Sequence, residues 1–258
     1  MNFDTDINKC LDSFKPISLD AMDSVALMDR LDSKYVFNAQ RLPELLDQLC
    51  TNYDVLEVNK LRSSNYESLY FDTKNFDLYK FHHNGKPNRF KIRFRKYAST
   101  SAIFFEIKLK NSLGRTIKKR IAQPAITENI HFFANDFLQQ HTAYSASDFE
   151  AKMWVNFTRI TMVSKNLTER VTLDFGLIYR TGDIIKSFHG LVIAEVKEEK
   201  HNRSAFSVLM KQHCIRQGTI TKYCVGIASL FQHLKTNNFK PQLHTINKIL
   251  NDTPPRNY

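Results

Sequence analysis

The sequence is poor in the residues that define several common protein classes. Seven glycines and seven prolines in 258 residues exclude a collagen-like repeat or a linker-like chain. The four cysteines lie far apart without a Cys-x-x-Cys pair, so they indicate buried thiols and not a zinc site or a disulfide framework. The N-terminal residues lack the apolar segment of a signal peptide, and no apolar run is long enough to span a membrane. We therefore expect a globular protein in the cytoplasm.

Familiar catalytic signatures are also missing. The sequence has no G-x-x-x-x-G-K-[ST], no G-x-G-x-x-G and no H-E-x-x-H, which excludes the common nucleotide-binding loops and the zincin metal site. What the chain does have is positive charge, with 37 Lys and Arg residues against 26 Asp and Glu residues. Its hydrophobic content of 42% is that of a globular protein and not of a disordered one.

The positive charge is concentrated in one segment. Residues 86–120 contain twelve basic residues and a single acidic residue, Glu106, so this segment alone has a net charge of +11 and the remainder is balanced. A local excess of this kind indicates a polyanionic partner. Nucleic acid, an anionic membrane surface and a phosphate chain are the three candidates.

The apolar pattern predicts an α+β protein. Several strands are joined by short connections, which favours antiparallel pairing. An antiparallel β-barrel of about eight strands with helices packed outside fits this order better than a doubly wound sheet, which needs a crossover helix after each strand. We expect one domain over residues 1–235 and a polar, at most partly ordered tail over 236–258.

The expected elements have the following bounds. The strands are 32–37, 67–72, 89–97, 103–110, 116–121, 154–164, 169–175, 184–187 and 191–197. The helices are 17–28, 40–50, 127–140, 147–153, 204–216 and 224–235. Asn84-Gly85 predicts a hairpin between residues 77–81 and the strand at 89, because both residues tolerate positive φ.

Charged and apolar residues alternate along several of these strands. In residues 91–95, Lys91, Arg93 and Arg95 share one face, and Ile92 and Phe94 share the other. The same alternation places together Glu106, Lys108 and Lys110; Lys118 and Arg120; Arg170, Thr172 and Asp174; and Glu195, Lys197 and Glu199.

Two interpretations of this alternation are open. A one-sided antiparallel sheet could present its polar face to water. However, three consecutive strands with basic faces would repel one another unless an anion neutralises them. A barrel with the charged face inward would form a tunnel for a polyanion, and its apolar face would pack against outer helices.

Two carboxylates interrupt the basic faces. Glu106 and Glu195 each precede a lysine by two residues and share its face. A carboxylate in a phosphate tunnel would repel the substrate unless it binds Mg²⁺ or Mn²⁺, which prefer oxygen ligands. Alternatively, each glutamate forms ion pairs with neighbouring lysines or arginines.

Several short motifs resemble a known family in their order and spacing. They are 29–35 (DRLDSKY), 70–73 (YFDT), 89–97 (RFKIRFRKY) after the turn at Gly85, 105–108 (FEIK), 118–120 (KKR), Arg159, 170–174 (RVTLD), 195–197 (EVK) and 222–223 (KY). From about residue 16 to residue 230, the chain resembles the polyphosphate polymerase domain of the vacuolar transporter chaperone (VTC) complex. That domain belongs to the triphosphate tunnel metalloenzyme, or CYTH-like, superfamily.

The resemblance implies a tunnel enzyme that transfers the γ-phosphate of ATP to a growing inorganic polyphosphate chain. It implies ATP and inorganic polyphosphate or pyrophosphate as partners, and Mn²⁺ or Mg²⁺ as the cofactor. The residues that it places at catalytic positions are Lys34, Arg93, Arg95, Lys108, Lys197 and Lys222. Further phosphate contacts fall on Lys91, Lys118, Arg120, Arg159 and Arg170, and the metal positions on Glu195 and Glu106.

The chain departs from the family pattern at two places. Arg30 and Asp32 replace the glutamates of the superfamily's ExExK strand, which weakens a two-carboxylate metal site there. Thr219 stands where the family often has a lysine, so one phosphate contact is absent.

Two rival functions remain. A triphosphatase on the same tunnel would use water as the acceptor and more acidic metal ligands. A non-catalytic module could bind polyphosphate or nucleic acid, but a nucleic-acid surface favours exposed basic and aromatic residues together. Because the apolar residues here alternate strictly to the opposite face, we expect the charges to lie inside and nucleic acid not to be the partner.

Overall fold

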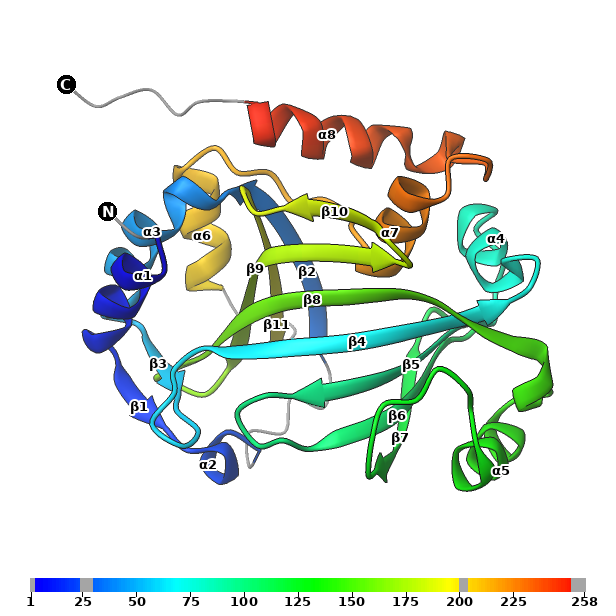
Figure 1. The fold of residues 1–258 in the computed structure, drawn as a ribbon. Helices are drawn as coiled ribbons and strands as arrows, with labels where there is room; N and C mark the ends of the chain where they lie inside the picture. The colour runs from blue at the N-terminus through cyan, green and yellow to red at the C-terminus, as the bar shows by residue number, and fades with distance from the viewer. Residues whose placement is uncertain (1–2, 24–29, 200–203, 252–258) are drawn as a thin grey trace.

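The computed structural model describes residues 3–23, 30–199 and 204–251, which form one large curved sheet with helices around it (Figure 1). The strands are β1 (Lys15–Ile17), β2 (Arg30–Asn38), β3 (Tyr53–Leu56), β4 (Ser64–Thr73), β5 (Arg89–Tyr97), β6 (Ile103–Lys110), β7 (Thr116–Gln123), β8 (Phe149–Ser164), β9 (Glu169–Thr181), β10 (Ile184–Phe188) and β11 (Leu191–Glu199). The α-helices are α1 (Phe3–Asp12), α2 (Leu19–Asp23), α3 (Leu42–Leu49), α4 (Asp77–His83), α5 (Phe132–His141), α6 (Ala205–Gln212), α7 (Lys222–Leu230) and α8 (Lys240–Asn251). Short 3₁₀ turns are η1 (Ala39–Arg41), η2 (Ala146–Asp148) and η3 (Asn237–Phe239).

The sheet has eleven strands and an open path. Its main order is β2-β11-β9-β8-β4-β5-β6-β7, with every neighbour antiparallel, while β3 and β10 branch from β8 and β9. In the part of the chain described, β2 and β7 at the two ends do not pair, so closure into a barrel is not confirmed. The reason lies at the outer edge of β2, where the α6–α7 connection binds instead. The Gly218 amide donates to the Lys34 carbonyl at 2.9 Å, and Gln217 forms a β-bridge with Tyr35.

The apolar faces predicted for the strands are confirmed, because each packs against helices. Ile92 and Phe94 of β5 and Phe105 of β6 are at most 1% exposed and contact α4 and α5 residues in one cluster. A second cluster joins α1, α3 and α6 to β2, β8, β9 and β11, and a third joins α7 and α8 to the sheet. Burial of these apolar faces is the main force that sets the strand register.

The expected hairpin at Asn84-Gly85 is wrong, since residues 77–83 form helix α4. The side chain of Asp72, at the end of β4, accepts hydrogen bonds from the amides of Leu78 and Tyr79, both at 2.9 Å. This carboxylate binds amides of the first helical turn, which have no partner within the helix. Asn84-Gly85 therefore connects a helix to β5.

The expected helix over 147–153 is also wrong beyond the short turn η2. Strand β8 already begins at Phe149, and it pairs with β4 from Phe149 opposite Thr73. The pairing with β4 over ten register positions outweighs the weak local preference of this segment for helix.

The polar segment after residue 235 contains an ordered helix, α8. Ile246 on this helix is 1% exposed and lies in the cluster around α7, with Leu243 and Ile249 packed against it. Residues 24–28 of the expected helix 17–28, and residues 252–258 of the expected tail, lie outside the described residues. None of the described helices has the length and apolar character needed to cross a membrane.

Candidate functional site

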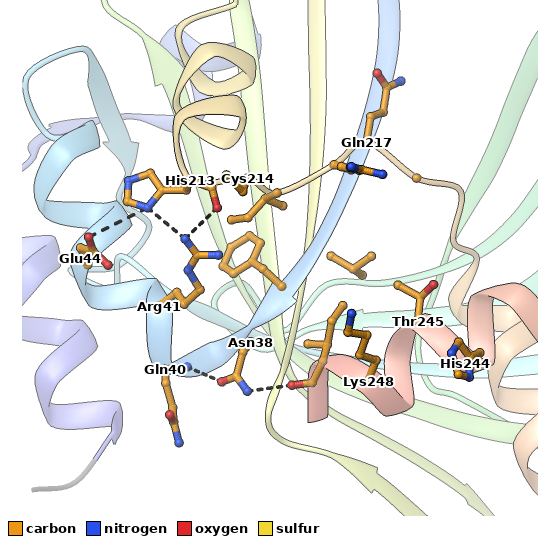
Figure 2. Close-up of a pocket in the computed structure, with 16 residues that line it drawn as sticks. Asn38, Gln40, Arg41, Glu44, His213, Cys214, Gln217, His244, Thr245 and Lys248 are labelled. Carbon is orange, nitrogen blue, oxygen red and sulfur yellow. Dashed lines mark hydrogen bonds and ion pairs between the residues drawn. The ribbon is translucent and has the colours of Figure 1, made fainter. Parts of the chain in front are cut away.

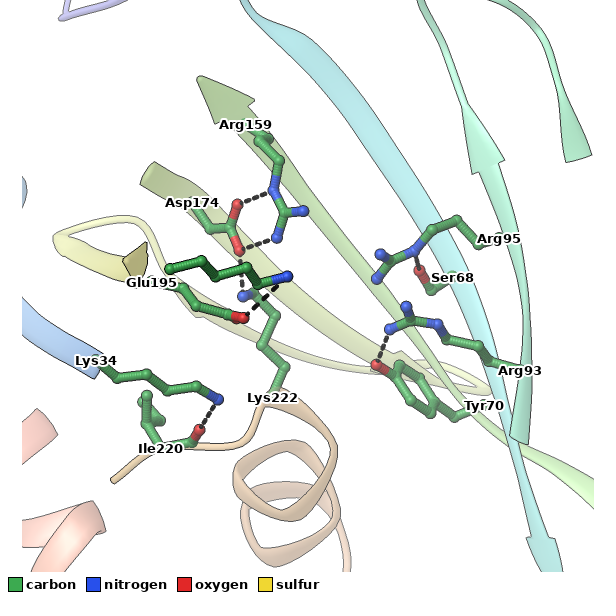
Figure 3. Close-up of polar contacts among 11 residues, drawn as sticks. Lys34, Ser68, Tyr70, Arg93, Arg95, Arg159, Asp174, Glu195, Ile220 and Lys222 are labelled. Atoms are coloured by element: carbon green, nitrogen blue, oxygen red, sulfur yellow. Dashed lines mark hydrogen bonds and ion pairs between the residues drawn. The ribbon is translucent and has the colours of Figure 1, made fainter. Parts of the chain in front are cut away.

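The charged faces of the strands meet on the concave side of the curved sheet. Figure 3 shows side chains from β2, β4, β5, β8, β9, β11 and α7 pointing toward one another. Since alternate residues of each strand face this side, the charged residues of neighbouring strands lie together on it. We call this space the tunnel.

The first cluster in the tunnel is centred on Glu106 of β6. Arg93 of β5 donates to Glu106 Oε2 from Nε at 2.8 Å and from Nη2 at 2.6 Å. Lys118 of β7 lies 2.5 Å from Glu106 Oε1, and the Tyr97 hydroxyl donates to the same oxygen at 3.3 Å. Burial alone would raise the pKa of Glu106, but the nearby charges, above all Arg93, lower it well below its usual range. Both carboxylate oxygens are thus occupied by cations, which favours the ion-pair interpretation for this residue.

A second cluster joins β8, β9 and α7. Arg159 donates to Asp174 through Nε at 2.5 Å and Nη2 at 2.7 Å, and Lys222 at the start of α7 also donates to Asp174 Oδ2. Asp174 is only 2% exposed. Burial would raise its pKa, but the charges of Arg159 and Lys222 lower it well below the usual range. This arrangement fixes two half-buried cations on one buried carboxylate.

A third group lines a cavity of about 390 Å³ at the tunnel mouth. Lys34, Lys91, Lys108 and Glu195 come from four different strands and all contribute to it. Lys34 Nζ donates to the Ile220 carbonyl at 3.0 Å. Glu195 lies 3.6 Å from Lys197, a looser contact than those of Glu106 and Asp174.

Cations outnumber carboxylates in the tunnel. The eleven cations are Lys34, Arg89, Lys91, Arg93, Arg95, Lys108, Lys110, Lys118, Arg159, Lys197 and Lys222, and the four carboxylates among them are Asp32, Glu106, Asp174 and Glu195. The excess has an electrostatic cost. Partial desolvation, followed by repulsion from Lys91, Arg93 and Lys34, lowers the pKa of Lys108 to about 7 despite attraction by Glu195, although the side chain itself is exposed to solvent. A bound polyanion would relieve this repulsion.

Aromatic rings hold several of these cations in place without neutralising them. Phe157 of β8 lies beneath Arg95 at 5.6 Å, Arg159 at 5.4 Å and Lys222 at 4.7 Å from its ring centre. Tyr66 of β4 stacks on Phe157 and also contacts Arg95 and Arg159. Because a cation–π contact leaves the full positive charge in place, these groups remain able to bind phosphate oxygens.

Two of the predicted phosphate contacts lie apart from this convergence. Arg120 is exposed on the edge strand β7 and covers the Phe104 ring at 4.4 Å. Arg170 donates to the Met22 carbonyl at 2.7 Å, toward α2.

Conversely, sequence reasoning did not assign roles to Asp174 and Phe157. The alternation of Asp174 with Val171 and Leu173 was the only available signal, because its partners come from other elements.

The glutamates differ in their capacity to bind a metal. The described residues contain no group of three or more His, Cys, Asp or Glu side chains suited to hold an ion. Of Glu106, Asp174 and Glu195, Glu195 has the loosest ion pair. Burial would raise its pKa, but the charges of Lys34, Lys197 and Lys108 lower it to about 2, so it is ionised. Mg²⁺ usually binds through one or two carboxylates together with substrate phosphates, and a single carboxylate fits that pattern.

The lowered pKa of Lys108 predicts pH-dependent anion binding. Raising the pH from about 6 to about 8.5 should weaken binding of inorganic tripolyphosphate, since Lys108 loses its charge near pH 7. Lys108→Arg keeps its charge at both values, so the wild type should lose more affinity than this variant, by a margin that solvent screening of the exposed side chain keeps small. Calorimetric titration at each pH measures the difference, and the titration of the ligand itself cancels in the comparison. Equal pH dependence in the two proteins would contradict a role for Lys108.

The comparisons with known proteins agree with this geometry. The family model of the VTC domain matches residues 29–231. A Bacillus halodurans protein provisionally assigned as an adenylate cyclase has the same fold, with a TM-score of 0.53, 17% identity, and coverage of 79% of this chain and 97% of its own. A Hippeastrum protein, HpAC1, provisionally assigned as an adenylyl cyclase and reported to have a dominant triphosphatase activity, gives a TM-score of 0.49 with 14% identity, covering 78% of this chain and 96% of its own.

A search of curated proteins finds no match. The family match spans the strands from β2 to β11 and helix α7, and therefore every cation of the three clusters. The chain belongs to the VTC domain family.

Proposed function

We propose that this protein is a polyphosphate polymerase that transfers the γ-phosphate of ATP to the end of an inorganic polyphosphate chain. The observation that supports this most is the gathering of eleven cations and only four carboxylates on the concave side of the sheet. An interior excess of positive charge is stabilised by a ligand with a regular series of negative charges. The position of most of these cations on the concave side of the sheet also disfavours nucleic acid, which needs an exposed surface, although Lys108 and Lys118 are exposed.

The side chains would act by binding and orienting phosphates. Arginines 93, 95 and 159 can donate paired hydrogen bonds to phosphate oxygens, and Lys34, Lys108 and Lys222 supply point charges. In the transfer, an oxygen of the terminal phosphate of the acceptor chain forms a bond to the γ-phosphorus. The bond from that phosphorus to the β–γ bridging oxygen breaks, and ADP leaves. Positioning and charge stabilisation supply most of the catalysis in such reactions.

Glu195 is the residue that we propose to hold a divalent metal, Mn²⁺ or Mg²⁺. The metal would bridge phosphate oxygens and neutralise the charge that develops during transfer. Glu106 and Asp174 are already neutralised by close ion pairs. Besides Glu195, the cavity has one further carboxylate, Asp32. So small a number of acidic groups favours a polymerase over a triphosphatase, for which we expect more acidic metal ligands.

Incubation with ATP and Mn²⁺ distinguishes the candidate functions. We expect long phosphate chains, detected by gel electrophoresis, together with ADP. Release of free phosphate alone would instead identify a triphosphatase. If the protein binds tripolyphosphate but consumes no ATP, it is a non-catalytic binding module.

Replacing Glu195 with glutamine tests the metal assignment. Glu195→Gln should keep the fold and bind ATP, but its turnover should no longer depend on Mn²⁺ concentration as in the wild type. Glu199→Gln on the same strand is the matched control, because Glu199 is exposed at the end of β11. The measurement is the rate as a function of Mn²⁺ at fixed ATP. Unchanged metal dependence in Glu195→Gln would leave Glu195 as an ion-pair partner of Lys197.

A further inference from the structure

A second cavity, of about 1220 Å³, lies outside the tunnel between the end of β2, α3, residues 213–218 and α8 (Figure 2). Residues Gln217 and Gly218 line both this cavity and the tunnel mouth, each from its own side. The hydrogen bond from the Gly218 amide to Lys34 and the bridge between Gln217 and Tyr35 join this wall to β2. The two cavities therefore adjoin at residues 217–218, but they differ in all their other lining residues.

The charged side chains of this cavity are mostly basic, and the other polar residues of its lining are uncharged or histidine. Arg41, Arg216 and Lys248 contribute to it from three different elements, and Glu44 is its one carboxylate. Among the described residues, the side chains of Arg216 and Lys248 have no hydrogen-bond or ion-pair partner. Arg41 is fixed by contacts of one nitrogen, Nη2, with the carbonyl of His213 at 3.0 Å and with its Nδ1 at 3.1 Å. The other guanidinium nitrogens of Arg41 therefore remain available to an anion.

Four apolar residues also line the cavity, among neutral polar ones. Val36 and Phe37 of β2, Ile215 and Ile249 line it beside the cations. An inorganic anion would use only the basic side, whereas an organic phosphate would also cover the apolar side. Ligand sites typically combine a largely apolar lining with a few placed polar groups.

We propose that this cavity is a binding site for a nucleoside monophosphate or a similar organic phosphate, distinct from the tunnel. The phosphate contacts Lys248, Arg216 and the free edge of Arg41. The base or other apolar part lies against Val36 and Ile215. Helix α8 supplies Lys248 from beyond the residues that match the family model, so the site combines the family's fold with a segment outside the match.

The test uses adenosine monophosphate and inorganic tripolyphosphate as separate probes in calorimetric titrations. Lys248→Glu should weaken adenosine monophosphate binding by about tenfold or more and leave tripolyphosphate binding unchanged. Arg93→Ala should weaken tripolyphosphate binding and leave adenosine monophosphate binding unchanged, because Arg93 lies in the tunnel. Lys240→Glu is the matched control, since it makes the same charge change on α8 but lines neither cavity.

Each of three results would overturn the proposal. The first is that the wild type does not bind adenosine monophosphate. The second is that Lys240→Glu weakens binding as much as Lys248→Glu, which would show a general effect of net charge. The third is that Arg93→Ala abolishes binding, which would place the nucleotide in the tunnel. Melting temperatures of the variants check that each remains folded. If the wild type binds adenosine monophosphate but not tripolyphosphate, the proposed polymerase function is refuted and the proposed site is not.

Discussion

Replacing Arg93 with alanine should reduce the rate of phosphate transfer by the equivalent of about 2–4 kcal/mol of transition-state stabilisation, as for loss of a preorganised charged donor. Arg93 lies in the tunnel and binds both Glu106 and the Tyr70 hydroxyl, the latter at 2.6 Å. Its removal takes away a phosphate contact and also leaves Glu106 less neutralised. The repulsion between that buried carboxylate and phosphate should add to the loss.

The measurement is kcat/KM for ATP, together with the melting temperature. Arg93→Lys should recover only part of the activity, because lysine keeps the charge but not the planar pair of donors. Arg115→Ala, in the exposed turn between β6 and β7, removes the same side chain outside the tunnel and should have little effect. A folded Arg93→Ala protein with full activity would refute the tunnel assignment.

Replacing Asp174 with asparagine should destabilise the ligand-free protein by about 3–5 kcal/mol, the usual cost of breaking a buried ion pair from one side. Asp174 is the only carboxylate that contacts both Arg159 and Lys222 among the described residues. Without it, two half-buried cations face each other uncompensated. Tripolyphosphate should then raise the melting temperature of Asp174→Asn more than that of the wild type, because the ligand supplies the missing negative charge.

Chemical denaturation measures the loss of stability, and thermal melts with and without tripolyphosphate measure the rescue. Asp77→Asn is a suitable control, because both side chains of the Asp77–Lys80 pair are exposed, at 42% and 50%, and surface pairs contribute little. If Asp174→Asn has wild-type stability and the wild-type ligand response, Asp174 does not hold these two cations. In that case the phosphate-binding charges are organised in another way.

The pattern of the strands was predictable from sequence wherever it depends on neighbouring residues. β5 and β6 have the bounds that alternation predicted, and Phe94 and Phe105 lie on the buried face as expected. A one-residue shift would bury the charges of an entire strand, so the pattern permits only one register. The expectation that the charges converge inside the molecule follows from the same argument.

Elements whose stability depends on distant residues were not predictable. Helix α4 replaces the expected hairpin because Asp72 binds its first amides, and α8 is ordered because Ile246 is buried against α7. The open sheet reflects the binding of residues 217–218 to the edge of β2. None of these contacts has a local signature in composition or periodicity.

The amino-acid sequence by itself determined the α+β class, the strand register and the common face of the cations, since alternation is a property of adjacent residues. Only the tertiary structure decided which charges neutralise each other. Lys222 meets Asp174 across 48 residues of sequence, and Glu106 is enclosed by cations from two other strands. Such pairings depend on how the sheet curves and where α7 docks, because ion pairs require side chains to approach within a few ångströms in space. The free energy of a buried charge is therefore set by its neighbours in the fold and not by its neighbours in the chain.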